Sequence, residues 1–78
     1  MDKNIEELVL LLLYLTSWEE KGYPGPVLRS WKGYPWEILN ALEEQGLIRQ
    51  GRRAKSVYLT EEGGKKAKML EKKILKQT

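Results

Sequence analysis

One pattern restricts the fold of this 78-residue sequence more than any other: a helix stop followed at once by two short strands. Pro35 to about Gln45 suits a helix, since proline is favoured at a first helical position. Gly46 stands where a glycine commonly caps a helix C-terminus. The runs at 47–50 and 56–60 have the residue types of strands. This segment therefore predicts a helix that leads directly into a two-stranded hairpin.

Further helices are expected on both sides of this segment. Residues Ile5–Glu20 predict a helix, because acidic residues suit its first turn and apolar residues recur along it. The sequence KGYPGP at 21–26 breaks that helix, and Pro26 suits the first turn of a short helix through Trp31. Thr60 predicts the N-cap of a last helix. The inward residues of this last helix are expected to be Ala67, Leu70 and Ile74, with Met69 and Leu75 as further candidates.

The predicted order is helix, short helix, helix, hairpin, helix, which is that of a winged helix-turn-helix. This fold class is mainly α, with a small two-stranded antiparallel β wing. We predict one such domain over residues 1–78, because the chain has the length of a single domain and contains no repeat or low-complexity linker.

Two resemblances to known families bear on the fold. The stretch ILNALEEQGLI at 38–48, followed by SVYLTEEG at 56–63, resembles the reading helix, wing and following helix of MarR- and PadR-type bacterial regulators. Three segments, LLLYLT at 11–16, RSWKGYPW at 29–36 and AKSVYLTEEG at 54–63, resemble a family of small prokaryotic proteins of unknown function over nearly the whole chain. The first resemblance implies a winged helix, and the second implies a free-standing small protein without an assigned activity.

The resemblance to the regulators implies that one face of the third helix enters a DNA major groove. That face carries Tyr34, Trp36, Glu37, Asn40 and Ala41. Only Asn40 is a typical base reader, because a side-chain amide pairs well with adenine. Glu37 can accept a hydrogen bond from cytosine but repels phosphates. The helix therefore departs from the usual DNA-binding pattern.

The predicted wing is strongly basic. Its tip carries Arg52, Arg53 and Lys55, and Arg49 precedes it, with no acidic residue between 49 and 60. Such side chains suit phosphate contacts, which position a protein on nucleic acid without reading its sequence. A charged tip that prevents pairing between sheet edges explains the same residues equally well. We predict binding to double-stranded DNA with weak sequence preference, as in a transcription regulator.

The alternative prediction is a protein–protein interaction module that does not bind DNA. The acidic, aromatic third helix suits a protein partner, because tryptophan is enriched at interface hot spots. Trp31 is expected in the core, and Trp36 is expected to be more exposed. A homodimer is a separate prediction. It would form through Ile5–Leu15 and the C-terminal helix, because a small monomer does not readily cover a helix that is apolar on several faces.

The composition argues against several other classes of function. The sequence has no cysteine and no histidine, which excludes disulfides and Cys/His metal sites, and no cofactor is expected. An enzyme is not expected, because the adjacent glutamates point apart on a helix and the serines lack a histidine. The apolar run Leu8–Leu15 is too short to span a membrane. Since the N-terminal residues are acidic, unlike a signal peptide, we expect a cytoplasmic protein.

Overall fold

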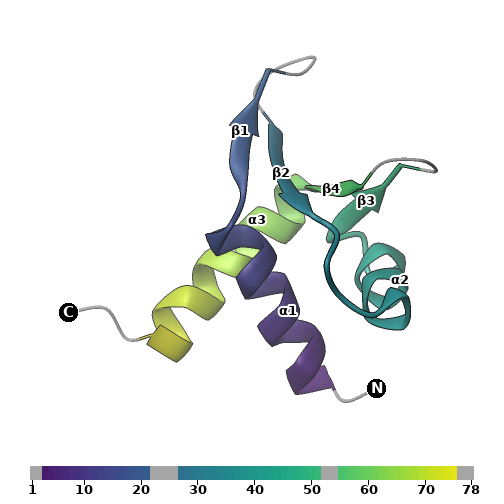
Figure 1. The fold of residues 1–78 in the computed structure, drawn as a ribbon. Coiled ribbons are helices and arrows are strands. Elements are labelled where there is room, and N and C mark those ends of the chain that lie inside the picture. The colour runs from purple at the N-terminus through teal and green to yellow at the C-terminus, as the bar shows by residue number, and fades with distance from the viewer. Residues whose placement is uncertain (1–2, 22–26, 52–54, 76–78) are drawn as a thin grey trace.

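Four strands in the described part of the chain form one antiparallel sheet in the order β1-β2-β4-β3 (Figure 1). The computed structural model describes residues 3–21, 27–51 and 55–75. The elements are α1 (Lys3–Leu15), β1 (Trp18–Glu20), β2 (Val27–Trp31), α2 (Trp36–Glu44), β3 (Ile48–Gln50), β4 (Ser56–Leu59), α3 (Glu61–Leu70) and a closing π-helical turn, η1 (Glu71–Leu75).

This architecture corrects the predicted fold class. The two strands expected in a wing, β3 and β4, are present, but β4 pairs with β2 on one side as well as with β3 on the other. The order of elements is helix, strand, strand, helix, strand, strand, helix. The prediction of a winged helix-turn-helix with a two-stranded wing is therefore wrong.

The first error lies at the end of α1, which stops at Leu15 instead of Glu20. The hydroxyl of Thr16 donates to the carbonyl of Leu12 at 2.7 Å, and the hydroxyl of Ser17 donates to the carbonyl of Tyr14 at 2.6 Å. The same two carbonyls also accept the backbone N–H groups of Thr16 and Ser17, at 3.0 and 3.1 Å, so the hydroxyls add a second bond to each at the end of the helix. The chain beyond them is extended and forms β1.

The second error concerns the short helix expected from Pro26 to Trp31. Pro26 lies outside the described residues, and the chain from Val27 to Trp31 is strand β2. Leu28 pairs with Leu59 and lies against the core, whereas Trp31 is 64% exposed, so the expectation of a core Trp31 is also wrong. Neighbouring residues of a strand point to opposite faces. Hydrogen bonding to β1 along one edge and to β4 along the other holds Val27–Trp31 as a strand.

The predicted caps at the end of α2 and at the start of α3 are confirmed. Gly46 has a φ of 77°, and its N–H donates to the carbonyl of Glu43 at 2.9 Å, so it ends α2 in the left-handed conformation that glycine favours. The hydroxyl of Thr60 accepts the N–H of Gly63 at 3.0 Å. The same hydroxyl donates to the carbonyl of Gly46 at 2.6 Å. Thr60 thus joins the end of α2 to the start of α3.

Gly63 allows α3 to approach the backbone that leaves α2. A Cβ atom at this position would lie 1.9 Å from the carbonyl oxygen of Leu47. A Cβ at the neighbouring Gly64 would meet nothing within 4 Å. Only the first glycine is therefore required by packing.

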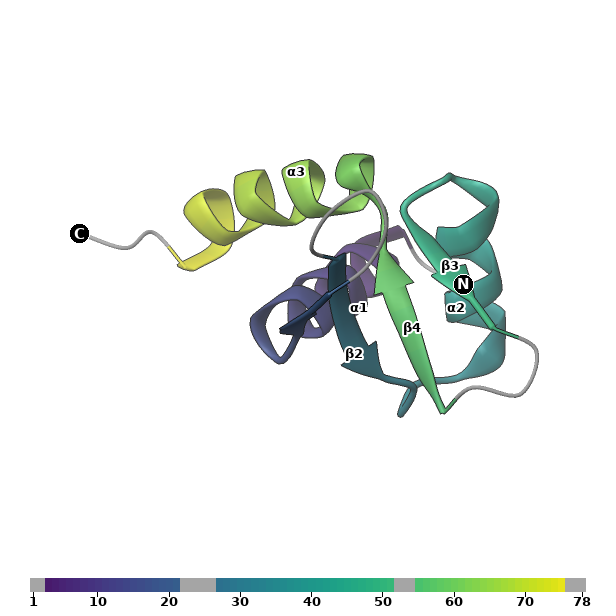
Figure 2. The same cartoon turned by 90° about the horizontal axis from the view of Figure 1, so that it is seen from above.

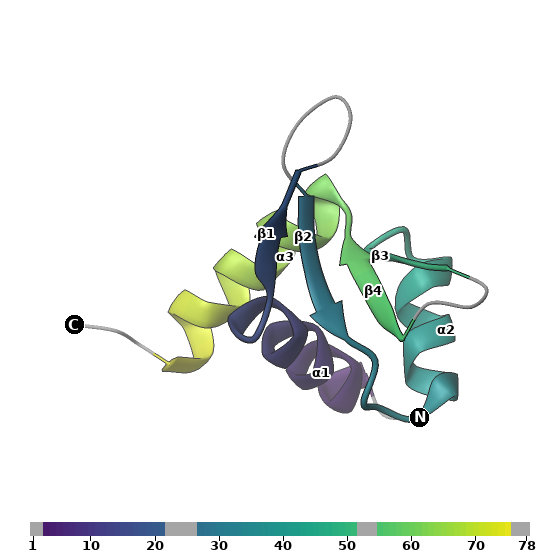
Figure 3. The same cartoon turned by 45° about the horizontal axis from the view of Figure 1, so that its top comes forward.

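The core lies between the helices and one face of the sheet. Figure 3 shows α1 and α3 together behind β1 and β2, with α2 beside β3 and β4, and Figure 2 shows the same arrangement from above. The buried apolar residues are Val9, Leu10, Leu11, Leu13, Ile38, Leu39, Leu42, Leu47, Ile48, Val57, Leu59, Ala67 and Leu70. The opposite face of the sheet contributes none of these residues.

Helix α1 supplies four of the buried residues and is the most apolar of the three described α-helices. It has 13 residues, which corresponds to a length of about 20 Å. Within the described part of the chain, no helix is both long enough and apolar enough to cross a membrane.

Candidate functional site

The face of the sheet that points away from the core carries a row of four residues, one from each strand. Trp18 of β1 lies opposite Arg29 of β2, Arg29 lies opposite Tyr58 of β4, and Tyr58 lies opposite Arg49 of β3. Directly paired residues project to the same side of a sheet. We call these four residues the outer row. Aromatic and arginine side chains alternate along it.

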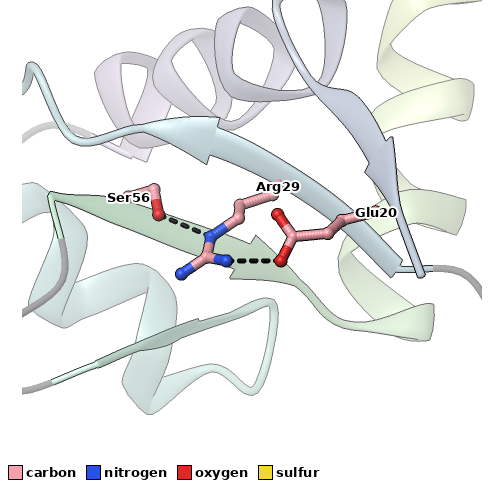
Figure 4. Close-up of polar contacts among 3 residues, drawn as sticks. All are labelled: Glu20, Arg29 and Ser56. Carbon is pink, nitrogen blue, oxygen red and sulfur yellow. Dashed lines mark hydrogen bonds and ion pairs between the residues drawn. The ribbon is translucent and has the colours of Figure 1, made fainter. Parts of the chain in front are cut away.

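Arg29 is held in the middle of the outer row by its neighbours. Its Nε donates to the hydroxyl of Ser56 at 2.6 Å, and its Nη1 donates to Oε1 of Glu20 at 2.7 Å (Figure 4). Its guanidinium carbon lies 4.5 Å from the centre of the Tyr58 ring. These contacts fix the plane of the guanidinium, because its donors form a rigid fork that matches its partners.

Two tryptophans extend the aromatic surface beside Arg29. The rings of Trp18 and Trp31 have centroids 5.1 Å apart and are tilted by 48°. Trp31 is paired with Ser56, so it projects to the same side of the sheet as the outer row. A side chain with an apolar ring and 64% exposure is unusual on a sheet unless it contacts something else.

Basic residues surround this aromatic surface. Arg49 is exposed, and it lines a hollow in the surface together with Tyr58 and Lys21. The N–H of Lys32 donates to the carbonyl of Lys55 at 2.9 Å, which brings two lysines together where β2 ends and β4 begins. The ion pairs among the described residues involve none of these four basic side chains.

The predicted reading residues of α2 lie on a separate element. Trp36 is 66% exposed and Glu37 is exposed, both in the first turn. Asn40 is half-buried, and its Oδ1 accepts the Nε2 of Gln50 at 2.9 Å. Oε1 of Glu43 accepts the same Nε2 at 3.0 Å. Asn40 and Glu43 therefore attach α2 to β3.

The seven predicted site residues thus fall into three groups. Trp36, Glu37 and Asn40 lie on α2, whereas Arg49 and Lys55 lie on or next to the strands of the sheet. Arg52 and Arg53 lie outside the described residues. The structure brings Arg49, and none of the α2 residues, into the outer row.

The sequence analysis missed Trp18, Arg29, Trp31 and Tyr58 as members of one surface. The signal was the alternation in Val27–Trp31, where Leu28 and Ser30 point to one side and Arg29 and Trp31 to the other. A period of two is typical of a strand. The assignment of this segment to a helix concealed the pattern.

A comparison with known proteins identifies the chain at the level of a family. Residues 1–77 match the family described as "Domain of unknown function (DUF6429)". The chain belongs to this family. The resemblance of the whole chain to a family of unknown function is thereby confirmed, whereas the DUF6429 match gives no support to the resemblance to MarR- and PadR-type regulators.

A curated relative of this DUF6429 chain is the uncharacterized protein y4hR of Sinorhizobium fredii (strain NBRC 101917 / NGR234). The two are 32% identical over 74 residues, which cover 94% of this chain and 90% of the relative. No solved structure matches the chain.

Proposed function

We propose that this protein binds single-stranded nucleic acid on the outer face of its sheet. The observation that carries the proposal is the outer row, in which aromatic and arginine side chains alternate on a face that contributes nothing to the core. Unpaired bases stack on aromatic rings and on guanidinium planes. Four strands at a spacing of about 4.8 Å make the row roughly 14 Å wide, which suits a few bases.

The fixed position of Arg29 favours stacking. Its bonds to Ser56 and Glu20 hold the guanidinium plane before a ligand arrives, so less side-chain entropy is lost on binding. Trp31 offers an exposed ring on the same face. Each base that stacks on such a group contributes about 1–3 kcal/mol.

The basic residues around the row suit the phosphates of the same strand. Arg49 and Lys21 line the hollow beside Tyr58, and Lys32 and Lys55 lie near the Trp31 end of the sheet. The predicted phosphate contacts of Arg52 and Arg53 fall outside the described residues and stay predictions. Since phosphate contacts carry no sequence information, we expect weak sequence preference.

Double-stranded DNA suits this surface less well. Paired bases stack on one another and offer no face to a flat aromatic surface, so the duplex would contact only the basic residues. Base reading by α2 forms no part of the proposal, because the helix carries Glu37, Glu43 and Glu44 and no basic residue. A role in transcription regulation stays a prediction.

Fluorescence anisotropy at low salt tests the proposal, with one labelled mixed-sequence oligonucleotide used both as a single strand and as a duplex. We expect tighter binding of the single strand. Trp31→Ala should weaken it by about 5- to 150-fold, from the stacking energy of one base. Trp36→Ala is the matched control, since Trp36 is equally exposed but lies on α2. No binding of the single strand would overturn the proposal.

A protein partner on α2 is the second candidate. The observation in its favour is Trp36, which is 66% exposed beside the acidic Glu37 at the start of the helix. An exposed tryptophan next to a carboxylate suits a partner with a basic, apolar surface. For a partner recovered from the native cell, this candidate requires Trp36→Ala to abolish binding and Trp31→Ala to leave it unchanged. The opposite pattern would contradict it.

A further inference from the structure

Helix α1 has an apolar surface on the side that faces away from its own core. Its inward side buries Val9, Leu10, Leu11 and Leu13. A second set of residues, each 41–47% exposed, follows the spacing 3, 4, 3 along the helix. We call this set the α1 stripe, and it consists of Ile5, Leu8, Leu12 and Leu15.

The polarity of α1 is the reverse of that of an ordinary surface helix, in which polar residues face water. Glu6 accepts a hydrogen bond from Gln45 of α2 at 2.8 Å, and Glu7 lies 3.9 Å from the Nζ of Lys66 on α3. Both acidic side chains thus contact neighbouring helices of the same domain. The α1 stripe lies on the other side of the helix and is left to solvent. Single exposed leucines are common, but a continuous line of four apolar residues marks a contact surface.

We infer that the α1 stripe binds the α1 stripe of a second copy of this chain, with the two helices antiparallel. The spacing 3, 4, 3 is that of two successive a and d pairs in a coiled coil. It is also symmetric, so a two-fold axis brings Ile5 opposite Leu15 and Leu8 opposite Leu12 of the partner. A two-fold interface requires such self-complementarity.

The electrostatics of α1 favour the antiparallel arrangement. The last turn of α1 contains no basic residue, so no positive charge in that turn offsets the negative end of the helix dipole. An antiparallel partner places the positive end of its dipole beside that end. A parallel pair would bring like ends together.

The size of the α1 stripe sets the strength of the dimer. Two helices in contact over about 20 Å bury on the order of 800–1,000 Å² in total, which is at the lower limit for a specific interface. We therefore expect a dissociation constant of the dimer in the micromolar range or above. Because α1 lies between the stripe and the core, the dimer leaves both outer rows accessible, and it does not depend on the proposed nucleic-acid function.

Sedimentation equilibrium of the full chain, without nucleic acid, measures the dimer. From about 10 µM to about 1 mM, the mass should rise from 9.1 kDa towards twice this value. Leu8→Glu and Leu12→Glu should stay monomeric. Met69→Glu is the control, because Met69 is 71% exposed on α3 and should leave association unchanged. Circular dichroism identifies any variant that fails to fold. A wild-type chain that is monomeric at the highest concentration would overturn the inference.

Crosslinking then tests the orientation of the helices. The chain contains no cysteine, so single introduced thiols report only the new contacts. A mixture of Ile5→Cys and Leu15→Cys chains under mild oxidation should give the mixed dimer in excess over either homodimer, since the antiparallel pair brings these positions together. Ile5→Cys chains that link mainly to one another would show a parallel pair and contradict the antiparallel arrangement.

Discussion

The guanidinium of Arg29 lies over the ring of Tyr58, 4.5 Å from its centre, although 28 residues lie between the two positions in the sequence. The contact exists only because β2 and β4 pair in this register. Glu20 and Ser56 complete the surroundings of the guanidinium. Local stability and the proposed binding surface therefore depend on the same side chain.

Arg29→Lys should destabilise the fold by about 1–2 kcal/mol, because lysine has no Nε–H donor and leaves the buried hydroxyl of Ser56 without its partner. Urea unfolding followed by tryptophan fluorescence measures this change. Lys65→Ala is the control, since its ion pair with Glu61 is exposed and should contribute less than about 0.5 kcal/mol. Equal effects of the two substitutions would argue against a special role for Arg29.

Gly63 and Gly64 should respond in opposite directions to alanine. Gly63→Ala forces α3 away from the carbonyl of Leu47 and should cost about 1–3 kcal/mol. Gly64→Ala meets no atom and should stabilise α3 by about 0.5–1 kcal/mol, since alanine loses less backbone entropy in a helix. Thermal unfolding of both variants measures these two changes in stability. A stabilising Gly63→Ala would show that α3 does not approach this backbone.

Thr60 should tolerate serine but not valine. Thr60→Ser keeps the hydroxyl that caps α3 and donates to Gly46, and we expect a change below about 0.5 kcal/mol. Thr60→Val keeps the size and removes the hydroxyl, and should cost about 1–2 kcal/mol. The midpoints of urea unfolding give the comparison. Two equal midpoints would mean that the hydroxyl contributes nothing to the junction.

Arg49 and Trp31 should affect nucleic-acid binding in different ways. Arg49→Ala removes a phosphate contact, so it should lower affinity for all sequences and reduce the slope of log K against log salt by about 0.7. Trp31→Ala removes a stacking partner and should leave that slope unchanged. Titrations of one single strand at several salt concentrations provide both slopes. If Trp31→Ala also reduced the salt slope, Trp31 would not act only as a stacking partner.

The parts of the fold that depend on local chemistry were predictable from the sequence. Gly46 ends α2 because of its own φ, and Thr60 begins α3 through a bond to a residue three positions later. The strands β3 and β4 follow each other in the chain and were expected as a hairpin. Each of these features depends on residues close together in sequence.

The parts that depend on distant pairing were not predictable in the same way. The strand conformation of Val27–Trp31 depends on partners in β4, and proline at 26 is compatible with a helix as well as with a turn. The outer row requires the register of three strand pairs at once, so Arg29 could not be placed beside Tyr58 from the sequence alone. Arg49 was identified only because its charge belongs to the basic hairpin.

The strand order also determines when this chain can complete its fold during synthesis. The apolar helix α1 is made well before the residues that cover it from α3, Ala67 and Leu70. The second edge of β2 likewise stays unpaired until β4 has been made. Until α3 has left the ribosome, α1 lacks part of its cover, and at this stage the nascent chain is most exposed to aggregation and to chaperones.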